Sequence, residues 1–158
     1  MRRLGIDLGT VRTGLAVAEH DVRVATPLCT VNHTGLAQAV LAVAEWVVKQ
    51  HIDEAVVGLP LDLAGREGEA ARRVRQFAEA LAKRAGIRVL LWDERLSTVA
   101  AERSLRSQGV RGAARRRVVD QVAATLLLQS YLDREAQRAL DASGVTFDPD
   151  EEFERDDG

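Results

Sequence analysis

Apolar and polar residues alternate over the first 26 positions, a pattern typical of strands that are half-buried in a sheet. The segments 3–8 (RLGIDL) and 13–19 (TGLAVAE) flank the turn GTVR, and the segment 21–26 (DVRVAT) continues the alternation. These three segments predict an antiparallel three-stranded meander.

After residue 35 the apolar spacing becomes helical. Apolar residues recur at helical intervals over 36–47 and 70–81, and each stretch precedes a short apolar run, EAVVGLP at 54–60 and IRVLLW at 87–92. Because a crossover through a helix joins parallel strands, we expect both runs to be buried strands that pair in parallel.

The last third of the chain predicts two further helices. Ser97 or Thr98 caps a short helix that reaches Gln108, and a long helix runs from about Arg115 to about Arg138. The expected core face of the long helix consists of Val119, Val122, Ala123 and Leu126. The whole order predicts an α/β fold, with a mixed five-stranded sheet that is antiparallel at first and parallel afterwards, flanked by helices.

Composition adds a boundary and a charge asymmetry. A chain of 158 residues suits one domain, which we place at residues 1–140. Residues 148–157 carry seven acids against one arginine, a net charge of −6, so we expect 141–158 to be an acidic, disordered tail. Since the whole chain carries −2, residues 1–147 are mildly basic at +4.

The basic residues and the single cysteine bear on the partner and on the compartment of the protein. Only two of the 22 basic residues are lysines, a bias that arginine-mediated phosphate recognition or a high genomic GC content would equally produce. Cys29 is the only cysteine, which fits a reducing compartment. The chain shows no apolar stretch long enough for a signal peptide or a membrane span, so we expect a cytoplasmic protein without a membrane partner.

Carboxylates follow two of the predicted strands at positions where a charge is costly to bury. Asp7 interrupts an apolar strand just before a glycine turn, where it could bind a metal ion or close an Asx turn with Gly9 and Thr10. Asp93 and Glu94 follow the strand 87–92 at its carboxyl end, where open α/β sheets place their ligands. Only one of this pair can face the site because side chains alternate along an extended chain; the alternative is that both are solvated.

A third carboxylate lies in the long helix. Asp120 shares one helix face with Ala123, Ala124 and Leu127, so it borders the buried side; pairing with Arg116 or Arg117 is the alternative. Carboxylates from a first strand, a later parallel strand and the last helix form a hard oxygen site of the kind that Mg²⁺ or Mn²⁺ prefers. The three histidines lack zinc-site spacing and are interpreted as solvated.

Arginines bracket these acids along the chain and would neutralise phosphates without reading bases. Taken singly, each could equally be a solvated arginine on a helix face. The candidates are Arg12, Arg95, Arg103, Arg106, Arg111, Arg115, Arg116 and Arg117.

Four motifs, in their order and spacing, resemble the YqgF family, also called RuvX, of RNase H-like Holliday junction resolvases or pre-16S ribosomal RNA nucleases. The match covers most of residues 3–133 and consists of GIDLGTVRTGLAV (5–17), VVGLPLDLAGREG (56–68), WDERLST (92–98) and DQVAATLLLQSYL (120–132). The resemblance implies an RNase H-like fold and a metal-binding acidic triad of Asp7, Glu94 and Asp120. It also implies a cleft floor and two supporting residues: Gly58, Leu59, Pro60, Arg95 and Thr98.

The function implied by this resemblance is metal-dependent hydrolysis of phosphodiester bonds in structured nucleic acid, most specifically at the 5′ end of precursor 16S ribosomal RNA. Resolution of four-way DNA junctions is the alternative. Symmetric junction cleavage requires two active sites in a dimer, whereas a monomer can trim RNA, and the sequence leaves monomer and homodimer open. Expected partners are structured RNA or branched DNA, and ribosomal precursor particles.

Two readings of other classes compete with the nuclease. The motif GIDLGT also opens the first phosphate loop of actin-like and sugar-kinase-like ATPases, but 158 residues cannot supply the second domain that this class requires. A non-catalytic nucleic-acid-binding factor would need only the arginines. Retention of three carboxylates argues against it, because acids that repel one another destabilise a fold unless a cation compensates them.

Overall fold

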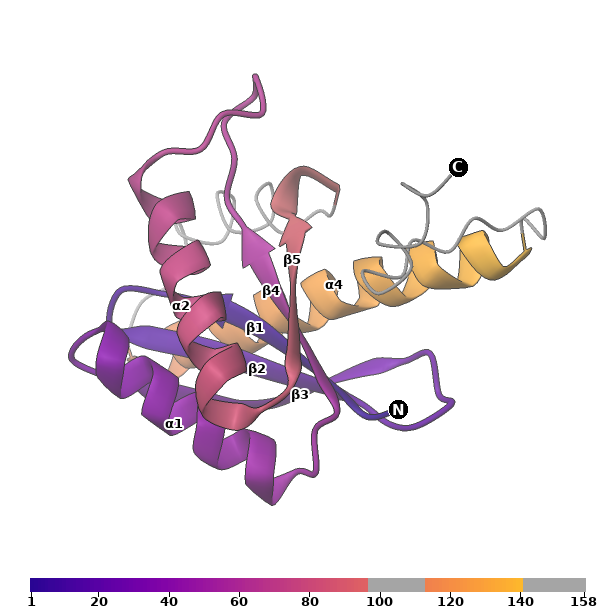
Figure 1. Ribbon diagram of the computed structural model, residues 1–158, viewed down its shortest axis with the longest axis horizontal. Helices are drawn as coiled ribbons and strands as arrows, with labels where there is room; N and C mark the ends of the chain where they lie inside the picture. Colours follow the sequence, from indigo (N-terminus) through magenta and orange to yellow (C-terminus); the bar gives the residue numbers. More distant parts are fainter. Residues whose placement is uncertain (97–112, 141–158) are drawn as a thin grey trace, which may run out of the picture.

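The computed structural model describes residues 1–96 and 113–140, which form one five-stranded sheet with helices on both faces (Figure 1). In chain order the elements are β1 (Arg3–Leu8), β2 (Arg12–Ala18), β3 (Ala25–Asn32), α1 (Leu36–Lys49), β4 (Glu54–Leu59), α2 (Glu69–Ala85), β5 (Arg88–Asp93), the 3-10 turn η1 (Glu94–Leu96) and α4 (Ala113–Leu140). The strand order across the sheet is β3-β2-β1-β4-β5.

The pairing follows the predicted change of direction. β1 pairs with β2, and β2 with β3, in antiparallel fashion, whereas β1–β4 and β4–β5 are parallel. The predicted mixed α/β sheet is therefore confirmed. Gly86, at φ 67, ends α2 in the left-handed conformation that glycine adopts without steric cost.

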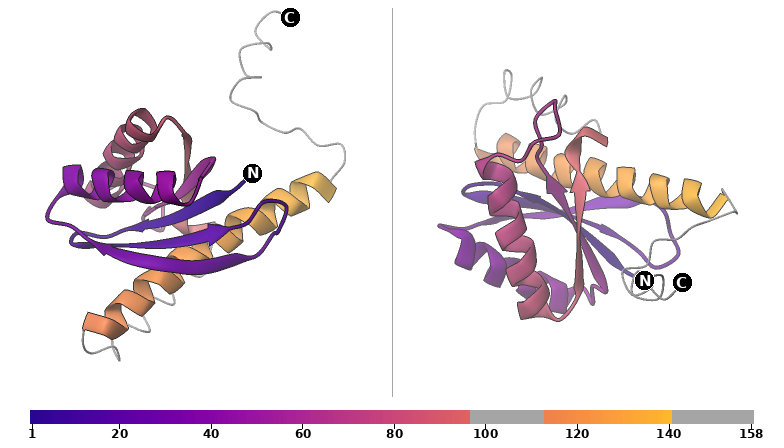
Figure 2. Two further views of the ribbon diagram at one scale, coloured as in Figure 1. Left: turned by 90° about the horizontal axis from the view of Figure 1, so that it is seen from below. Right: turned by 45° about the horizontal axis from the view of Figure 1, so that its top comes forward.

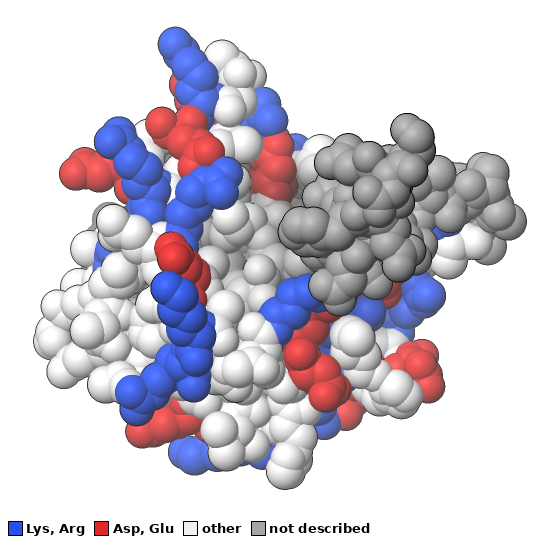
Figure 3. Space-filling model, viewed as in Figure 1, with Lys and Arg blue, Asp and Glu red and all other residues white. Residues whose placement is uncertain are grey.

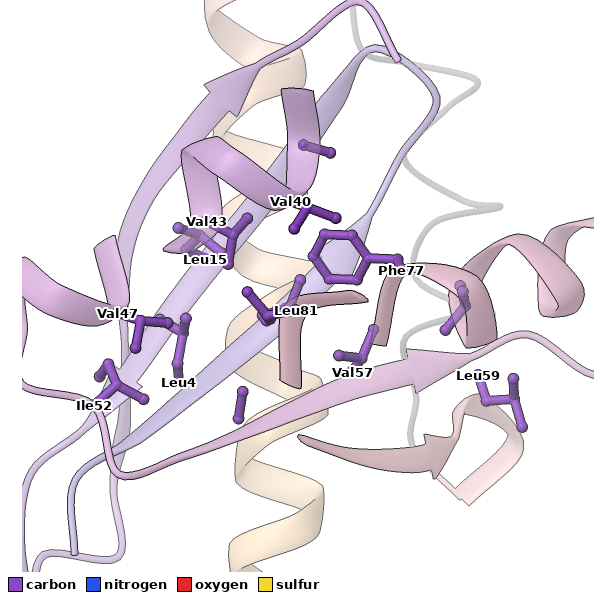
Figure 4. Packing of buried hydrophobic residues seen from close by; sticks show 14 of the residues in the cluster. Leu4, Leu15, Val40, Val43, Val47, Ile52, Val57, Leu59, Phe77 and Leu81 are labelled. Atoms are coloured by element: carbon purple, nitrogen blue, oxygen red, sulfur yellow. The ribbon is translucent and has the colours of Figure 1, made fainter. Parts of the chain in front are cut away.

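The helices form two layers around the sheet (Figure 2). α1 and α2 cover one face, where Leu4, Leu15, Val43 and Phe77 belong to the larger core cluster (Figure 4). α4 crosses the opposite face, and its contacts with β1, β2 and β3 build a second cluster around Leu128. Because alternate residues of a strand point to opposite faces, β2, β3, β4 and β5 each contribute residues to both clusters, whereas the apolar residues of β1 belong to the larger one.

Two strand predictions were wrong in detail. The third strand begins at Ala25, not at residue 21, because residues 19–22 form the turn after β2: Asp21 has φ 61, and the Val22 amide donates to the Glu19 carbonyl. β5 is not a buried strand, since it lies at the edge of the sheet and only Trp92 in it is buried.

The core face of α4 also differs from the predicted one. Of the predicted residues only Ala123 is buried, whereas Val119, Val122 and Leu126 are half-buried. The buried residues of α4 are Ala123, Ala124, Leu127, Leu128 and Leu132. Gly5 and Gly14 leave room for the helix backbone at Ala124 and Asp120 to lie close to the sheet, and this close approach buries the face that carries Ala124 and Leu128.

Some predictions lie outside the described residues. These are the short helix from Ser97 or Thr98 to Gln108, and the acidic tail at 141–158. The division into a domain at 1–140 and a tail at 141–158 stays a prediction. Within the described part of the chain, no helix combines the length and the apolar character needed to cross a membrane.

Candidate active site

Asp7 lies on the face of the sheet that α4 covers, and only 7% of it is exposed. Its cross-strand partner on β2 is Gly14. On the other side, β1 pairs with β4 through Ile6 and Val57, so the next residue of each strand, Asp7 and Gly58, lie side by side. Asp7 is thus flanked by a glycine on each neighbouring strand.

These two glycines leave room for the other two acids over the sheet. A methyl group on Gly14 would lie 2.1 Å from the backbone oxygen of Asp120, and one on Gly58 would lie 2.8 Å from Oε1 of Glu94. The backbone of Asp120 therefore lies over β2, Asp7 lies on β1, and the side chain of Glu94 lies over β4. These three strands are adjacent, and neighbouring strands are about 4.8 Å apart. We call these three acids the acidic row.

The two acids that follow β5 have different environments. Glu94, the first residue of η1, is buried, with 8% exposed. Asp93 turns away and pairs with Arg95, whose Nη2 lies 2.7 Å from its Oδ2. Hydrogen bonds from the Arg95 side chain hold the pKa of Asp93 below its ordinary value. Glu94 is therefore the member of the pair that joins the acidic row.

Asp120 is engaged by an arginine. The Nε atom of Arg12 donates to Oδ2 of Asp120 at 3.0 Å, and both side chains are half-buried. Among the described side chains, the partner of Asp120 is thus Arg12; the side chains of Arg116 and Arg117 lie outside the described residues. Within residues 1–96 and 113–140, no three acidic, histidine or cysteine side chains are grouped closely enough to hold a metal ion. Of the three acids in the row, Asp120 has an ion pair with an arginine that a cation would have to replace.

A cavity of about 240 Å³ opens beside Glu94 on the side of the β1–β2 turn. Gly58 and Pro60 line it, as the family resemblance implies for a cleft floor, whereas Leu59 between them belongs to the larger core cluster. The remaining lining residues are Leu8, Gly9, Thr10, Ala70, Arg73 and Val74. The cavity therefore connects a buried carboxylate with the turn of the first motif and the first half of α2.

The predicted substrate-binding arginines are only partly described. Arg12 and Arg95 each pair with an acid of the site region, as given above. Arg115 and Arg116 belong to the first turn of α4. Thr98 and Arg111 lie outside the described residues.

One histidine prediction was wrong. His20 and His51 are exposed, but His33 is buried, with 5% exposed, and its Nε2 lies 2.8 Å from the Thr13 hydroxyl. Burial, assisted by the positive charge of Arg73, lowers the pKa of His33. His33 directly follows β3, and the sequence did not indicate its burial because its neighbours Asn32 and Thr34 are polar.

Sequence reasoning missed the role of the glycines within strands. Gly5 behaves like Gly14 and Gly58, since a methyl group on it would lie 2.7 Å from Cβ of Leu128. A glycine inside a strand often marks the close approach of another backbone or side chain, and three such residues on one face would have indicated where α4 and Glu94 pack.

A mixed five-stranded sheet with a long helix across one face, and with buried carboxylates on that face, is typical of an RNase H-like fold. A solved structure of T. thermophilus RuvC in complex with Holliday junction substrate has this fold, with a TM-score of 0.56 and 19% identity, covering 85% of this chain and 96% of that one. A second T. thermophilus RuvC structure aligns with a TM-score of 0.54 at 17% identity, covering 87% and 97% of the two chains. These likenesses confirm the predicted fold.

The chain belongs to the RuvX family, whose model, described as "Holliday junction resolvase", matches residues 1–134. A relative from Anaeromyxobacter dehalogenans is 47% identical over 136 residues, which are 86% of this chain and 99% of that protein. One from Mycobacterium leprae is 48% identical over 134 residues, 84% of this chain and 73% of that protein. Both bear the name "Putative pre-16S rRNA nuclease". The protein is accordingly a nuclease, a hydrolase of phosphodiester bonds.

Proposed function

We propose that this nuclease depends on a divalent metal ion and processes the 5′ end of precursor 16S ribosomal RNA. The observation that supports the metal-dependent chemistry is the acidic row, in which Asp7 and Glu94 are buried and glycines on the strands beside β1 leave room for Glu94 and for the backbone of Asp120. The substrate is proposed from the shared name of the relatives. The site of action is then the cytoplasm, with ribosomal precursor particles as partners.

The donor set fits Mg²⁺ or Mn²⁺. Asp7, Glu94 and Asp120 offer carboxylate oxygens alone, the ligands that hard divalent cations prefer, and Asp7 and Glu94 are buried where a cation would offset the cost of their charge. The bound metal would activate water and stabilise the leaving oxygen of the phosphodiester. Asp120 would join the other two after it separates from Arg12.

The arginines near the acidic row would bind the phosphates of the substrate. Arg12, once released from Asp120, and Arg95 beside Glu94 lie close enough to the acidic row to contact phosphates, and Arg115 and Arg116 begin the helix that carries Asp120. Thr98 and Arg111 complete the proposed substrate-binding set. Contacts between arginine side chains and the phosphates of a nucleic acid fix its position without reading its sequence.

Resolution of a four-way DNA junction is the second candidate, favoured by the description of the family model and by the RuvC-like fold. It requires two copies of the acidic row, arranged by a two-fold axis, whereas RNA trimming requires one. Oligomeric state in solution therefore discriminates between the two substrates. The non-catalytic alternative would bind nucleic acid without any need for the acids.

The deciding experiment compares cleavage of end-labelled precursor 16S RNA and of a synthetic four-way junction, with Mg²⁺, Mn²⁺ or EDTA. Wild type should cut the RNA with either metal but not with EDTA, and Asp120→Asn should lose this activity. Asp133→Asn is the matched control, because it makes the same change on an exposed position of the same helix. Faster cutting of the junction would favour resolution, and binding without cutting would favour the non-catalytic factor.

A further inference from the structure

Among the described residues, Arg73 is the one basic residue that lines the cavity beside Glu94, and the sequence prediction did not include it. It lies in α2, on the opposite side of the cavity from the strands, and is half-buried. Its Nη2 atom donates to the backbone oxygen of Thr10 at 3.3 Å, across the mouth of the β1–β2 turn. The guanidinium is therefore held against the cavity instead of extending into solvent.

Unlike three other arginines near the site, Arg73 has no acidic counterpart among the described residues. Other arginines around the site pair with acids: Arg12 with Asp120, Arg95 with Asp93, and Arg75 with Glu67. Among the described residues, no carboxylate lies within ion-pair distance of Arg73, and the carbonyl of Thr10 occupies only one of its five N–H donors. A positive charge with donors to spare thus faces the cavity that contains Glu94.

The helix around Arg73 favours an anion at this place. α2 carries five basic residues against two acids, and Figure 3 shows basic side chains gathered over it. A phosphodiester brought to Glu94 meets the repulsion of the acidic row, which a neighbouring guanidinium offsets. Arginine matches phosphate oxygens with two parallel hydrogen bonds, each stronger than a neutral one.

We propose that Arg73 binds a backbone phosphate of the nucleic-acid substrate and so positions the strand over Glu94. It is a substrate-binding residue contributed by α2, a helix on the face of the sheet opposite α4. The proposal rests on the proposed nuclease function, but it concerns binding, which can be measured without cleavage. The competing role is structural: the bond to Thr10 would merely tie α2 to the β1–β2 turn.

The test measures the dissociation constant of a labelled precursor-RNA fragment in EDTA over a range of salt concentrations. Arg73→Gln removes the charge, Arg73→Lys retains it, and Arg72→Gln makes the same charge change on the exposed neighbouring residue. We expect Arg73→Gln to weaken binding about tenfold. It should also reduce the slope of log K against log salt by about 0.7–0.9, the value for one lost phosphate contact.

The variants separate the two roles. Under the phosphate role, Arg73→Lys keeps the wild-type salt slope, Arg72→Gln resembles wild type, and in the cleavage assay Arg73→Gln raises KM more than it lowers kcat. An unchanged salt slope in Arg73→Gln would overturn the proposal, and so would a loss shared equally by Arg73→Gln and Arg73→Lys with a lowered melting temperature. If the wild type does not cleave, the nuclease function fails while the binding result still stands.

Discussion

Replacing Gly58 with alanine should separate catalysis from stability at the acidic row. The new methyl group would lie 2.8 Å from Oε1 of Glu94, 3.2 Å from its Cγ and 3.3 Å from Cδ1 of Leu127. The closest of these atoms ends a flexible side chain, so the carboxylate can move away while the backbone of β4 stays in place. The change therefore acts on the position of Glu94, without removing any catalytic group.

The expected costs differ in size. Overpacking a buried position costs about 1–3 kcal/mol, and the reduced freedom of the unfolded chain returns about 0.4–1 kcal/mol, so the free energy of unfolding should fall by no more than about 2.6 kcal/mol. A catalytic group misplaced by about 1 Å can lower the rate about 100-fold, which corresponds to about 2.7 kcal/mol of activation free energy. Activity should thus suffer more than stability.

The assay pairs kcat for RNA cleavage with urea unfolding. Gly35→Ala is the control, since no atom lies within 4 Å of the methyl group it would add. It should keep wild-type kcat. In the background of Glu94→Gln, adding Gly58→Ala should lower kcat no further, because both changes act through one carboxylate. Wild-type kcat in Gly58→Ala would refute the role of Glu94, and a stability loss above about 4 kcal/mol would show that the fold, not the site, was damaged.

Four further predictions follow from other parts of the molecule. Glu54 is 1% exposed and accepts hydrogen bonds from two arginines and a tyrosine at the end of the sheet away from the acidic row. Glu54→Ala should lower the free energy of unfolding, measured in urea, by about 3–5 kcal/mol and leave kcat unchanged. Arg12→Gln frees Oδ2 of Asp120, so calorimetry should show tighter Mn²⁺ binding; unchanged affinity would contradict the competition between arginine and metal. Because burial lowers the pKa of His33 from its ordinary 6.5, the unfolded chain binds more protons below that pH, so the unfolding free energy should fall as pH drops below about 6.5, and less so in His33→Gln. Burial raises the pKa of Cys29 to about 11 from 9.0, so its thiolate fraction, and with it the alkylation rate at pH 8, should be roughly 100-fold below that of an exposed cysteine; equal rates would show that the thiol is accessible.

The hydrophobic pattern predicted most of the fold because each element satisfies its own period. The helical spacing over 36–47 and 70–81 matches α1 and α2, and the apolar run 54–60 matches β4. The predicted start of the third strand was wrong because the alternation of apolar and polar residues continues through a turn in which Asp21 has a positive φ. The burial of β5 was predicted wrongly because an apolar run does not show whether another strand pairs with its outer edge.

The site was harder to predict because it depends on contacts between distant segments. The motifs indicate Asp7, Glu94 and Asp120 as site residues. The glycines that leave room for Glu94 and Asp120 over the sheet have no side chain, so the sequence does not indicate their role. The pairing of Arg12 with Asp120 joins residues 108 positions apart, and no local pattern predicts it. The same holds for Arg73, which reaches the site only because α2 begins beside the β1–β2 turn.

The proposed metal site would account for the arginine that pairs with Asp120. The carboxylates of Asp7 on β1, Glu94 in η1 and Asp120 on α4 repel one another, and the Arg12 guanidinium offsets part of that repulsion through Asp120. A metal bound as proposed would compete with Arg12 for the same oxygen, whereas a substrate phosphate would compete for the same arginine. Since a phosphate that draws Arg12 away exposes Asp120 to the metal, substrate and metal should strengthen each other's binding, and by thermodynamic linkage they must do so by the same factor.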